Sequence, residues 1–515
     1  MKVAISYPPI VNRLGQKAMV SQNRNVQFFK EPTYLLPVVH AQAATWLKDL
    51  GHDVLWDDGN AQLKTFDGWL KDLVAWEPEM IVLESTTPVM KFYWKTIGRL
   101  KEALPSCLIV LTGYHSMRAP QESLENSRAD IILRSNHVDF VLPKLAAFIA
   151  ENSDWRRTLP VDGLLFRGHG GLIQSTGNFS QVEPLENSPL VDRDLVRWRD
   201  YAYENGNYLQ TPGAYATSVI RDCMFGKCTF CRYNGPDLTF SMMPVSRSLD
   251  EYQALIEKHG AREIFDDSGV WYRGKDAREF AQGIIDRGLH KKDCYFGINT
   301  RFEYLDEETI KLLARANFRF VLLGLEAADE ETLRRLNKGY QSEHVYRCLE
   351  WMTKHGLHPH LTIMVGYYWQ TQEQLDATKA LVKDLMLKGL ARTLQVTICT
   401  PLDFTPYHRE CIEKGVLLTD DYDDHDMSRL IVKTPIPHDR YYDAIREMYS
   451  IAFHPLFIAR QLQFLLAFRK RDWQFLFTYG WRAVRRVRQH IFTLTRHRGK
   501  ASWEASPDGR AKQPV

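Results

Sequence analysis

The sequence predicts an α/β protein with two parallel-sheet units followed by a helical, basic C-terminal region. Two series of short apolar runs, each alternating with helical stretches, predict the two sheets; the first occupies residues 1–150 and the second begins near Ala214. Between them, residues 151–212 are punctuated by glycine and proline, which indicates a domain boundary. A chain of 515 residues has room for about two to four domains.

Residues 1–150 predict a doubly wound parallel sheet. After the first apolar run at residues 3–7, further short runs rich in Ile, Leu or Val follow at 53–56, 80–83, 108–111 and 131–133. Helical stretches separate most of these runs, as crossover helices would in a parallel sheet. Such sheets bind ligands at the carboxyl ends of their strands, and here these ends are mostly polar or carry glycine or proline.

The next stretch, residues 151–212, predicts a β-hairpin at about Gly163–Ser175 followed by an irregular linker. A second series of six strand candidates then predicts a partial (β/α)6 barrel over residues 213–437. These candidates lie at 215–220, 263–265, 295–298, 320–323, 360–365 and 394–399. In parallel barrels the active site lies at the carboxyl face of the strands.

Three of the eight cysteines lie within nine residues, directly after the first strand of the second series. Cys223, Cys228 and Cys231 have the spacing C-x4-C-x2-C. Three thiolates can hold three irons of a four-iron cubane and leave the fourth iron open to a ligand. A structural zinc site is the alternative, but the nearest downstream histidines, His259 and His290, lack finger-like spacing. The five scattered cysteines are expected to be core residues, and a disulfide framework is not expected.

The cysteine segment resembles the cluster loop of the radical S-adenosylmethionine superfamily. The usual spacing there is C-x3-C-x2-C with an aromatic residue before the last cysteine; Phe230 matches, and the first gap is one residue longer here. The segments that end the next three strands, at 265–269, 299–301 and 324–326, also resemble segments of the family. Their order and spacing after the cysteines strengthen the resemblance.

The resemblance implies a [4Fe–4S] cluster on the three cysteines. It also implies that S-adenosylmethionine binds four residues, Phe230, Asp267, Arg301 and Glu326. The chemistry implied is a 5′-deoxyadenosyl radical that takes hydrogen from an unactivated carbon, while the protein orients the cofactors and excludes water. No catalytic residue is assigned.

The first unit resembles the domain that precedes the barrel in the cobalamin-binding subclass of this family. Residues 111–116 look like that subclass's Gly-Gly-Pro-His-Ala-Thr segment, and residues 85–86 match in position. The resemblance implies that cobalamin contacts Ser85, Thr86, Gly113 and His115. No Asp-x-His-x-x-Gly motif is present in the sequence, so no histidine is expected to reach cobalt by that route. The alternative is a vestigial domain that only packs on the barrel.

The resemblance thus implies a radical enzyme that uses cobalamin to methylate an unactivated carbon of a small-molecule or lipid-like substrate. Two alternatives stay open: oxidation or cyclisation without methyl transfer, and a cobalamin- or metal-binding module without turnover. An electron donor such as flavodoxin or ferredoxin is an implied partner. Nucleic acid is not an expected partner, because no nucleic-acid-reading motif accompanies the basic residues.

Basic residues concentrate towards the C-terminus. Residues 438–500 predict a helical region in which residues 456–500 carry eleven Lys or Arg against one acid, and residues 501–515 predict a disordered tail. Apolar residues recur at helical spacing between 473 and 494. This segment either lies on an anionic membrane surface or packs on the barrel with a solvated cationic face. Since no spanning apolar run or signal peptide is evident, we expect a cytoplasmic protein, peripheral to the inner face of the membrane under the first interpretation.

Overall fold

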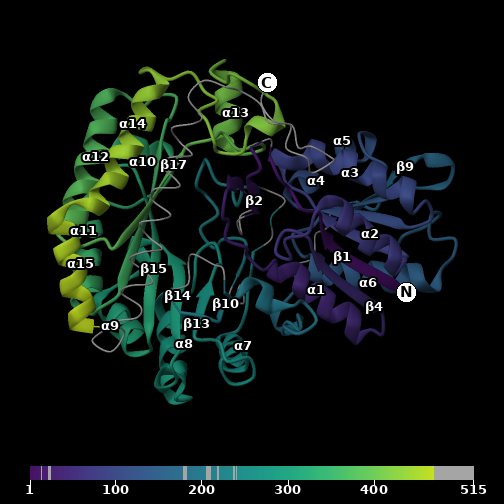
Figure 1. Ribbon diagram of the computed structural model, residues 1–515, viewed down its shortest axis with the longest axis horizontal. Helices are drawn as coiled ribbons and strands as arrows, with labels where there is room; N and C mark the ends of the chain where they lie inside the picture. Colours follow the sequence, from purple (N-terminus) through teal and green to yellow (C-terminus); the bar gives the residue numbers. More distant parts are fainter. Residues whose placement is uncertain are drawn as a thin grey trace.

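The structure, a computed structural model, describes residues 1–12, 14–20, 25–177, 183–203, 210–216, 220–235, 238 and 240–468. It contains two large sheets that lie side by side, each with its own helices (Figure 1). The helical segment expected at 473–494 and the tail expected at 501–515 lie outside the described residues. Within the described ranges, no helix combines the length and the apolar character needed to cross a membrane.

The first sheet has seven strands in the order β4-β1-β5-β6-β7-β8-β9. The first five in this order pair in parallel and confirm the predicted strand series. They are β1 (Lys2–Tyr7), β4 (Asp53–Asp58), β5 (Met80–Glu84), β6 (Leu108–Thr112) and β7 (Ile131–Leu133). The predicted hairpin forms as β8 (Leu164–Arg167) and β9 (Ile173–Ser175), and β8 pairs antiparallel with β7, so the hairpin extends this sheet.

Helices cover both faces of the first sheet. They are α1 (Val38–Asp49), α2 (Phe66–Trp76), α3 (Met90–Ala103), α4 (Tyr114–Arg118), α5 (Pro120–Glu125) and α6 (Val138–Glu151). Val3 and Ile5 of β1 belong to the core formed with α1 and α6, whereas Ala4 belongs to the core formed with α2 and α3. Because successive residues of β1 enter two different cores, the strand is apolar on both faces, as parallel strands of this kind are. A small antiparallel pair that the sequence did not predict, β2 (Lys17–Val20) and β3 (Val26–Phe29), lies beside it.

The second sheet has six strands, all parallel and in chain order, with β10 and β17 at its edges. They are β10 (Gly213–Ala216), β13 (Glu263–Asp266), β14 (Tyr295–Thr300), β15 (Phe318–Glu326), β16 (His358–Val365) and β17 (Thr393–Ile398). The predicted parallel series is therefore confirmed. The prediction that the first strand reaches Ile220 is wrong: among the described residues β10 comprises Gly213–Ala216, and Ile220 belongs to β11 (Ile220–Arg221), which pairs with β12 (Ser241–Met242).

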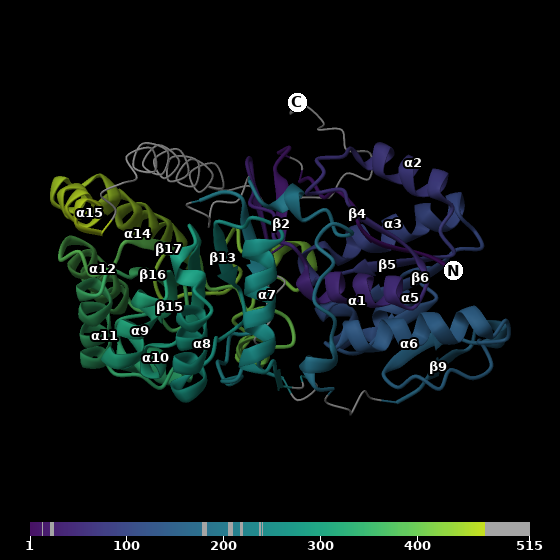
Figure 2. The same cartoon turned by 90° about the horizontal axis from the view of Figure 1, so that it is seen from below.

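Helices follow the strands of the second sheet, and α9, α11 and α12 lie on its outer side, away from the first sheet (Figures 1 and 2). The helices are α7 (Val245–Glu257), α8 (Gly274–Asp286), α9 (Glu307–Arg315), α10 (Glu330–Arg335), α11 (Ser342–Lys354) and α12 (Gln372–Leu387). Local sequence sets several of their starts. The Asp306 and Asp329 carboxylates accept the Thr309 and Thr332 N–H groups, which would otherwise lack partners in the first turn.

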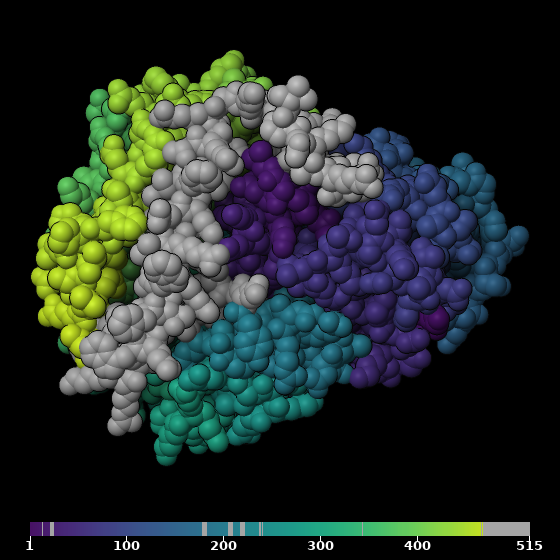
Figure 3. All heavy atoms as spheres, in the orientation of Figure 1, coloured from purple at the N-terminus to yellow at the C-terminus, as the bar shows by residue number. Residues whose placement is uncertain are grey.

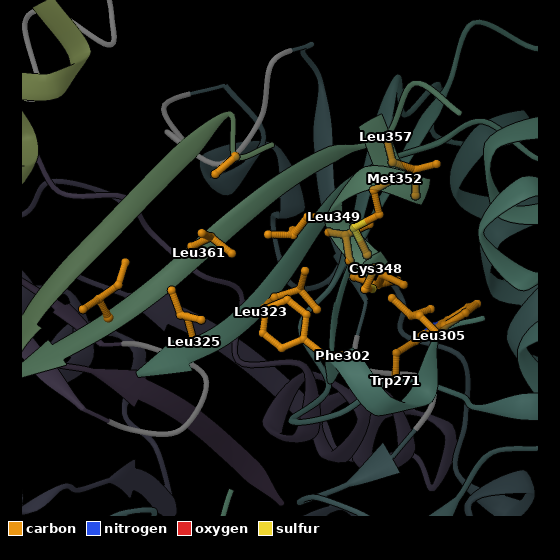
Figure 4. Close-up of a cluster of buried hydrophobic side chains, with 14 of the residues drawn as sticks. Trp271, Phe302, Leu305, Leu323, Leu325, Cys348, Leu349, Met352, Leu357 and Leu361 are labelled. Carbon is orange, nitrogen blue, oxygen red and sulfur yellow. The ribbon is translucent and has the colours of Figure 1, made fainter. Parts of the chain in front are cut away.

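The core between this sheet and its helices is apolar, and Figure 4 shows Cys348 of α11 among Leu349, Met352 and Leu357. The sequence predicted that the scattered cysteines are core residues, and all five are buried free thiols. They are Cys107, Cys294, Cys348, Cys399 and Cys411.

The opposite face of the second sheet is turned towards the first unit. Tyr215, Phe265 and Phe320 belong to the same buried cluster as Val3 and Ile5 of the first unit. Figure 3 shows the two units in direct contact, with the first in purple and blue beside the teal of the second. The last helices of the described part of the chain are α13 (Pro406–Glu413), α14 (His438–Ser450) and α15 (Pro455–Phe468).

Candidate cofactor site

The cysteine loop follows β10 and β11, at the carboxyl side of the second sheet. Contacts from two other elements fix its backbone at Thr229. The Thr229 N–H donates to the Leu336 carbonyl at 3.2 Å, and the Thr229 carbonyl accepts the Tyr407 N–H at 2.9 Å. The loop is therefore held between the end of α10 and the start of α13.

Cys223, Cys228 and Cys231 are free and partly buried thiols on this loop. Burial raises the pKa of each thiol, and negative charge on Cys223 and Cys228 raises the pKa of Cys231 further, so the three sulfurs influence one another. The three thiols do not form a complete metal-binding site, because no group of three or more His, Cys, Asp or Glu side chains that could hold an ion is found in the described part of the chain. Three neighbouring thiols on one short loop are nevertheless the donor set of a four-iron cluster with one open iron.

Gly269, in the segment after β13, approaches this loop closely. A Cβ at Gly269 would lie 2.6 Å from the Asp222 carbonyl oxygen and 3.1 Å from Cys223 Cβ. Any larger residue would therefore displace the backbone that carries the first cysteine. The glycine keeps the cysteine loop seated against the end of β13, as a cluster-binding loop at this face requires.

Two buried cations lie next to the cysteines. Arg301 Nη1 is 3.8 Å from Cys228 Sγ, and the guanidinium stacks over the Phe225 ring at 3.6 Å from its centre. Burial raises the pKa of Cys228, whereas the positive charges of Lys338 and Arg301 lower it. These cations favour the thiolate form, which is the form that binds iron. The site therefore suits a group of net negative charge.

The four residues implied for S-adenosylmethionine lie at the carboxyl end of the second sheet. Glu326 ends β15 and is buried, and its Oε1 accepts Lys338 Nζ at 2.9 Å. Lys338 in turn lies 6.0 Å from the centre of the Phe230 ring. Asp267, after β13, accepts Asn299 Nδ2 at 2.8 Å. The structure thus links Phe230 and Glu326 through Lys338, a residue that the sequence analysis did not assign to the site.

Gly324 shows how closely this corner is packed. A Cβ at Gly324 would lie 2.3 Å from Glu326 Oε1 and 2.7 Å from Lys338 Nζ. A side chain at this position would therefore break the ion pair between Glu326 and Lys338. The block Gly324-Leu325-Glu326 has a physical basis, because the glycine provides the space in which the carboxylate meets its cation.

The four residues implied for cobalamin lie together at the carboxyl ends of β5 and β6. The Ser85 N–H donates to the Thr112 carbonyl at 2.8 Å. Gly113 has φ 100°, and a Cβ there would lie 2.2 Å from the Ser85 carbonyl oxygen, so only glycine allows the two strand ends to approach. Small polar groups therefore line this edge, which is the place where open α/β sheets bind ligands.

His115 is buried and engaged by protein groups. Its Nδ1 lies 3.2 Å from Thr87 Oγ1, and its ring packs edge-on against Tyr422 and Phe404 at centroid distances of 4.8 and 5.7 Å. Its Nε2 lies 3.6 Å from Glu122 Oε2. The imidazole is thus packed among protein side chains at this edge.

Both flanks of the cysteine loop contact the first unit. Arg232, which directly follows Cys231, is buried and donates from Nη1 to Thr86 Oγ1 at 2.6 Å. Its guanidinium lies 5.0 Å from the centre of the Tyr114 ring. On the other flank, Asn136 Nδ2 donates to the Asp222 carboxylate. The sequence analysis missed Arg232, for which the only signal was its place beside a cysteine ligand.

A segment after β17, residues 400–426, closes over the edge of the first unit, and the sequence analysis did not predict it. Asp403 Oδ2 lies 2.9 Å from His425 Nδ1, and both side chains are buried. Burial raises the pKa of Asp403, but the interactions with His425, His408 and Arg232 together hold the pKa below its ordinary value. The Tyr422 hydroxyl meets Glu122 at 2.9 Å. This segment therefore connects the carboxyl edges of the two sheets.

Comparison with known proteins gives the site its context. Residues 217–382 match the Radical SAM superfamily. The chain is 25% identical over 359 residues to the anaerobic magnesium-protoporphyrin IX monomethyl ester cyclase of Rubrivivax gelatinosus, with 68% of this chain and 62% of the relative covered. It is 21% identical over 418 residues to the hopanoid C-3 methylase of Methylococcus capsulatus, with 79% and 74% covered. The chain thus spans less than two thirds of the length of the cyclase.

Among solved structures, the radical S-adenosylmethionine methyltransferase TsrM from Kitasatospora setae, with cobalamin and a [4Fe–4S] cluster bound, has a similar fold. The TM-score is 0.63 at 15% identity, with 87% of this chain and 88% of that chain covered. The likeness shows a shared fold across both sheets. The sequence match covers the cysteine loop and the strand ends around it, and it identifies residues 217–382 of this enzyme as a radical S-adenosylmethionine domain.

Proposed function

We propose that this enzyme binds S-adenosylmethionine at the carboxyl edge of the second sheet and cobalamin at that of the first, and methylates an unactivated carbon of a substrate held between them. The observation that carries the proposal is the hydrogen bond between Arg232 and Thr86 at 2.6 Å. It joins the residue beside Cys231 to a residue of the proposed cobalamin edge. The two edges are therefore within the reach of one side chain.

The residues of the second sheet have defined tasks in this proposal. Cys223, Cys228 and Cys231 would hold the cluster, and Arg301 and Lys338 would balance its charge. When bound, the cluster and S-adenosylmethionine supply a radical that takes hydrogen from carbon, and cobalamin supplies a methyl group. Since Arg301, Glu326 and Lys338 are all buried, water has little access to this corner.

The fold also supports the proposed cofactor positions. Glu326, Arg301 and Asp267 come from three adjacent strand ends, so a ligand that spans them contacts β13, β14 and β15 at once. Thr86 and Gly113 come from adjacent strand ends of the other sheet. The relatives support methyl transfer, because one is named as a methylase and a fold neighbour as a methyltransferase.

The cyclase relative supports a second candidate, oxidation or cyclisation without methyl transfer. The same site serves either reaction, because both begin with removal of hydrogen from carbon. The name of the hopanoid methylase favours a lipid-like substrate for this chain as well. In both cases a one-electron donor such as flavodoxin or ferredoxin would reduce the cluster.

The test begins with anaerobic purification, reconstitution and analysis of iron, sulfide and cobalt. About four irons per chain are expected. The triple variant of Cys223, Cys228 and Cys231 to Ala should lose them, while Cys107→Ala, which removes a buried thiol far from the loop, should keep them. Cobalt bound to the wild-type chain at a stoichiometry near one supports the first-sheet site.

The reaction is then followed with S-adenosylmethionine that carries a trideuterated methyl group, a reductant and a lipid extract as the substrate pool. Labelled methyl in extracted products, together with 5′-deoxyadenosine, supports the proposal. Production of 5′-deoxyadenosine with unlabelled, oxidised products contradicts methyl transfer and favours cyclisation. Iron without cobalt contradicts the proposed role of the first sheet.

A further inference from the structure

Helix α15 has two apolar faces. Phe457 and Phe464 are buried against the body of the protein, where the Arg392 guanidinium stacks over the Phe464 ring at 3.7 Å from its centre. Arg392 Nη1 donates to the Arg460 carbonyl at 3.5 Å, and Gln461 Nε2 donates to the Arg392 carbonyl at 3.4 Å. These contacts hold the inner face of the helix on the connection between α12 and β17.

The outer face of α15 is also apolar. Its exposed residues recur at positions i, i+3, i+4, i+7 and i+11, which form one stripe on an α-helix. They are Pro455, Ile458, Ala459, Leu462 and Leu466. Ile458, Leu462 and Leu466 are each 45% exposed. The stripe lies opposite the buried phenylalanines, so the inner packing does not cover it.

An apolar stripe of this kind is uncommon on the surface of a soluble protein. Helices that are apolar around their whole circumference are normally buried. The patch is enlarged by Leu456 and by Phe453, which precedes the helix, exposed by 44% and 45%. Arg460 is the only charged residue among the 14 residues of α15. Contiguous exposed apolar surface of this type marks an interaction site.

The charge of the adjoining sequence indicates the partner. Residues 456–500 carry eleven Lys or Arg against one acid, a net charge of +10. Apolar side chains next to concentrated positive charge are the combination that binds anionic bilayers, because the apolar groups enter the headgroup region while the cations meet anionic lipids. A second copy of the chain would bring the same positive charge to the contact and is disfavoured by repulsion.

We propose that α15 docks this enzyme on the surface of an anionic lipid bilayer, with the stripe of Ile458, Leu462 and Leu466 inserted among the lipid headgroups. Because Phe457 and Phe464 stay packed on the body of the protein, only the outer face of the described part of α15 would meet lipid, so this part lies in the plane of the membrane. The inner face keeps its contacts with Arg392, so docking needs no unfolding. The inference does not depend on the proposed reaction.

The test is co-sedimentation of the reconstituted full-length enzyme with vesicles of phosphatidylglycerol and phosphatidylcholine. We expect binding to vesicles rich in phosphatidylglycerol, weaker binding to pure phosphatidylcholine, and weakening by salt. The double variant Leu462→Glu and Leu466→Glu should bind at least about tenfold more weakly, because two carboxylates replace inserted leucines. The matched control, Leu172→Glu with Leu418→Glu, changes two leucines of equal or greater exposure elsewhere and should bind like the wild type.

Three results would overturn the proposal. They are the absence of binding to anionic vesicles, equal binding by the α15 double variant and the wild type, and a dimer in solution that the α15 variant alone dissociates. The second result would show that positive charge binds the vesicles without help from the stripe. The third would show that the stripe is the contact surface between two copies of the chain. The iron content and the circular dichroism of each variant are measured alongside, so that a folding defect is distinguished from lost docking.

Discussion

Gly269 offers a sharp test of the cysteine site, because a single methyl group there acts on the loop and on little else. A Cβ at this position would lie 2.6 Å from the Asp222 carbonyl oxygen, 2.9 Å from Tyr233 Cε2 and 3.1 Å from Cys223 Cβ. Its backbone is not in the left-handed region, so Gly269→Ala introduces no backbone strain of its own. The effect of the substitution is therefore purely steric.

The magnitude follows from these distances. Since real Cβ atoms stay beyond about 3.0 Å from such neighbours, the Asp222 carbonyl would have to retreat by at least about 0.4 Å. Overpacking of this kind costs about 1–3 kcal/mol. Cofactor sites need their ligands held within about 0.5 Å, so the shift moves Cys223 to the limit of a productive geometry. We expect a chain that folds but holds the cluster poorly.

The assay compares iron and sulfide per chain after identical anaerobic reconstitution. Gly269→Ala should contain less than half of the wild-type iron, while circular dichroism shows the same helical content. The matched control is Gly98→Ala within α3, where a Cβ would meet nothing within 4 Å and helix propensity improves. If Gly269→Ala binds wild-type amounts of iron with a wild-type spectrum, the cysteine loop is not seated against β13 as the structure indicates, and the reasoning fails.

Four further predictions test other parts of the molecule. Gly113→Ala should destabilise the first unit in urea unfolding, because the positive φ alone costs about 1–3 kcal/mol and the clash with Ser85 adds to that cost. An unchanged midpoint would contradict this packing. Arg301→Gln should lower the midpoint potential of the cluster in a redox titration, since a cation beside Cys228 is lost, and an unchanged potential would exclude this influence. Thr86→Val should cost about 1.5–3 kcal/mol and reduce iron loading because buried Arg232 loses an acceptor, whereas Thr86→Ser should restore both. Burial raises the pKa of Asp58 to about 6, above its unfolded value of 3.8, so the cost of burying the carboxylate is present at neutral pH and is relieved as the pH falls through 6. Relative to Asp58→Asn, the wild type should therefore gain about 1 kcal/mol in free energy of unfolding between pH 7 and pH 5. Parallel pH profiles of the two proteins would refute the shift.

The alternation of strands and helices was predictable because it depends on local pattern. Buried parallel strands give uniform apolar runs such as Met80–Glu84, and carboxylates such as Asp306 mark helix starts. The end of the first barrel strand was predicted wrongly. Residues 215–220 have the composition of one strand, but Ile220 lies in β11, where it pairs antiparallel with Met242. Such pairing depends on a partner 22 residues away, which local pattern does not reveal.

The residues of the candidate site also fall into two groups, those that local sequence predicted and those that it did not. The spacing of the three cysteines predicted the cluster site, and the position of Glu326 at a strand end predicted its place in the site. Arg232 and Asn136 have no local signal, because their importance comes from partners far away in sequence, Thr86 and Asp222. Residues that join two units are found only when the units are placed in space.

These long-range contacts bear on whether the first unit is a vestigial domain that only packs on the barrel. Packing alone needs apolar contact, which Tyr215, Phe265 and Phe320 provide. A buried arginine adds nothing to such packing, since burial of its charge costs free energy that apolar side chains of similar size would not incur. Burial lowers the pKa of Arg232, which is a direct sign of that cost. A cost of this kind is expected where a charge is needed at a site, and here it stands between the cluster loop and the ligand edge of the first sheet. This contact between the cluster loop and the first sheet therefore supports the proposal that the two edges act together, over the alternative of a domain that only packs on the barrel.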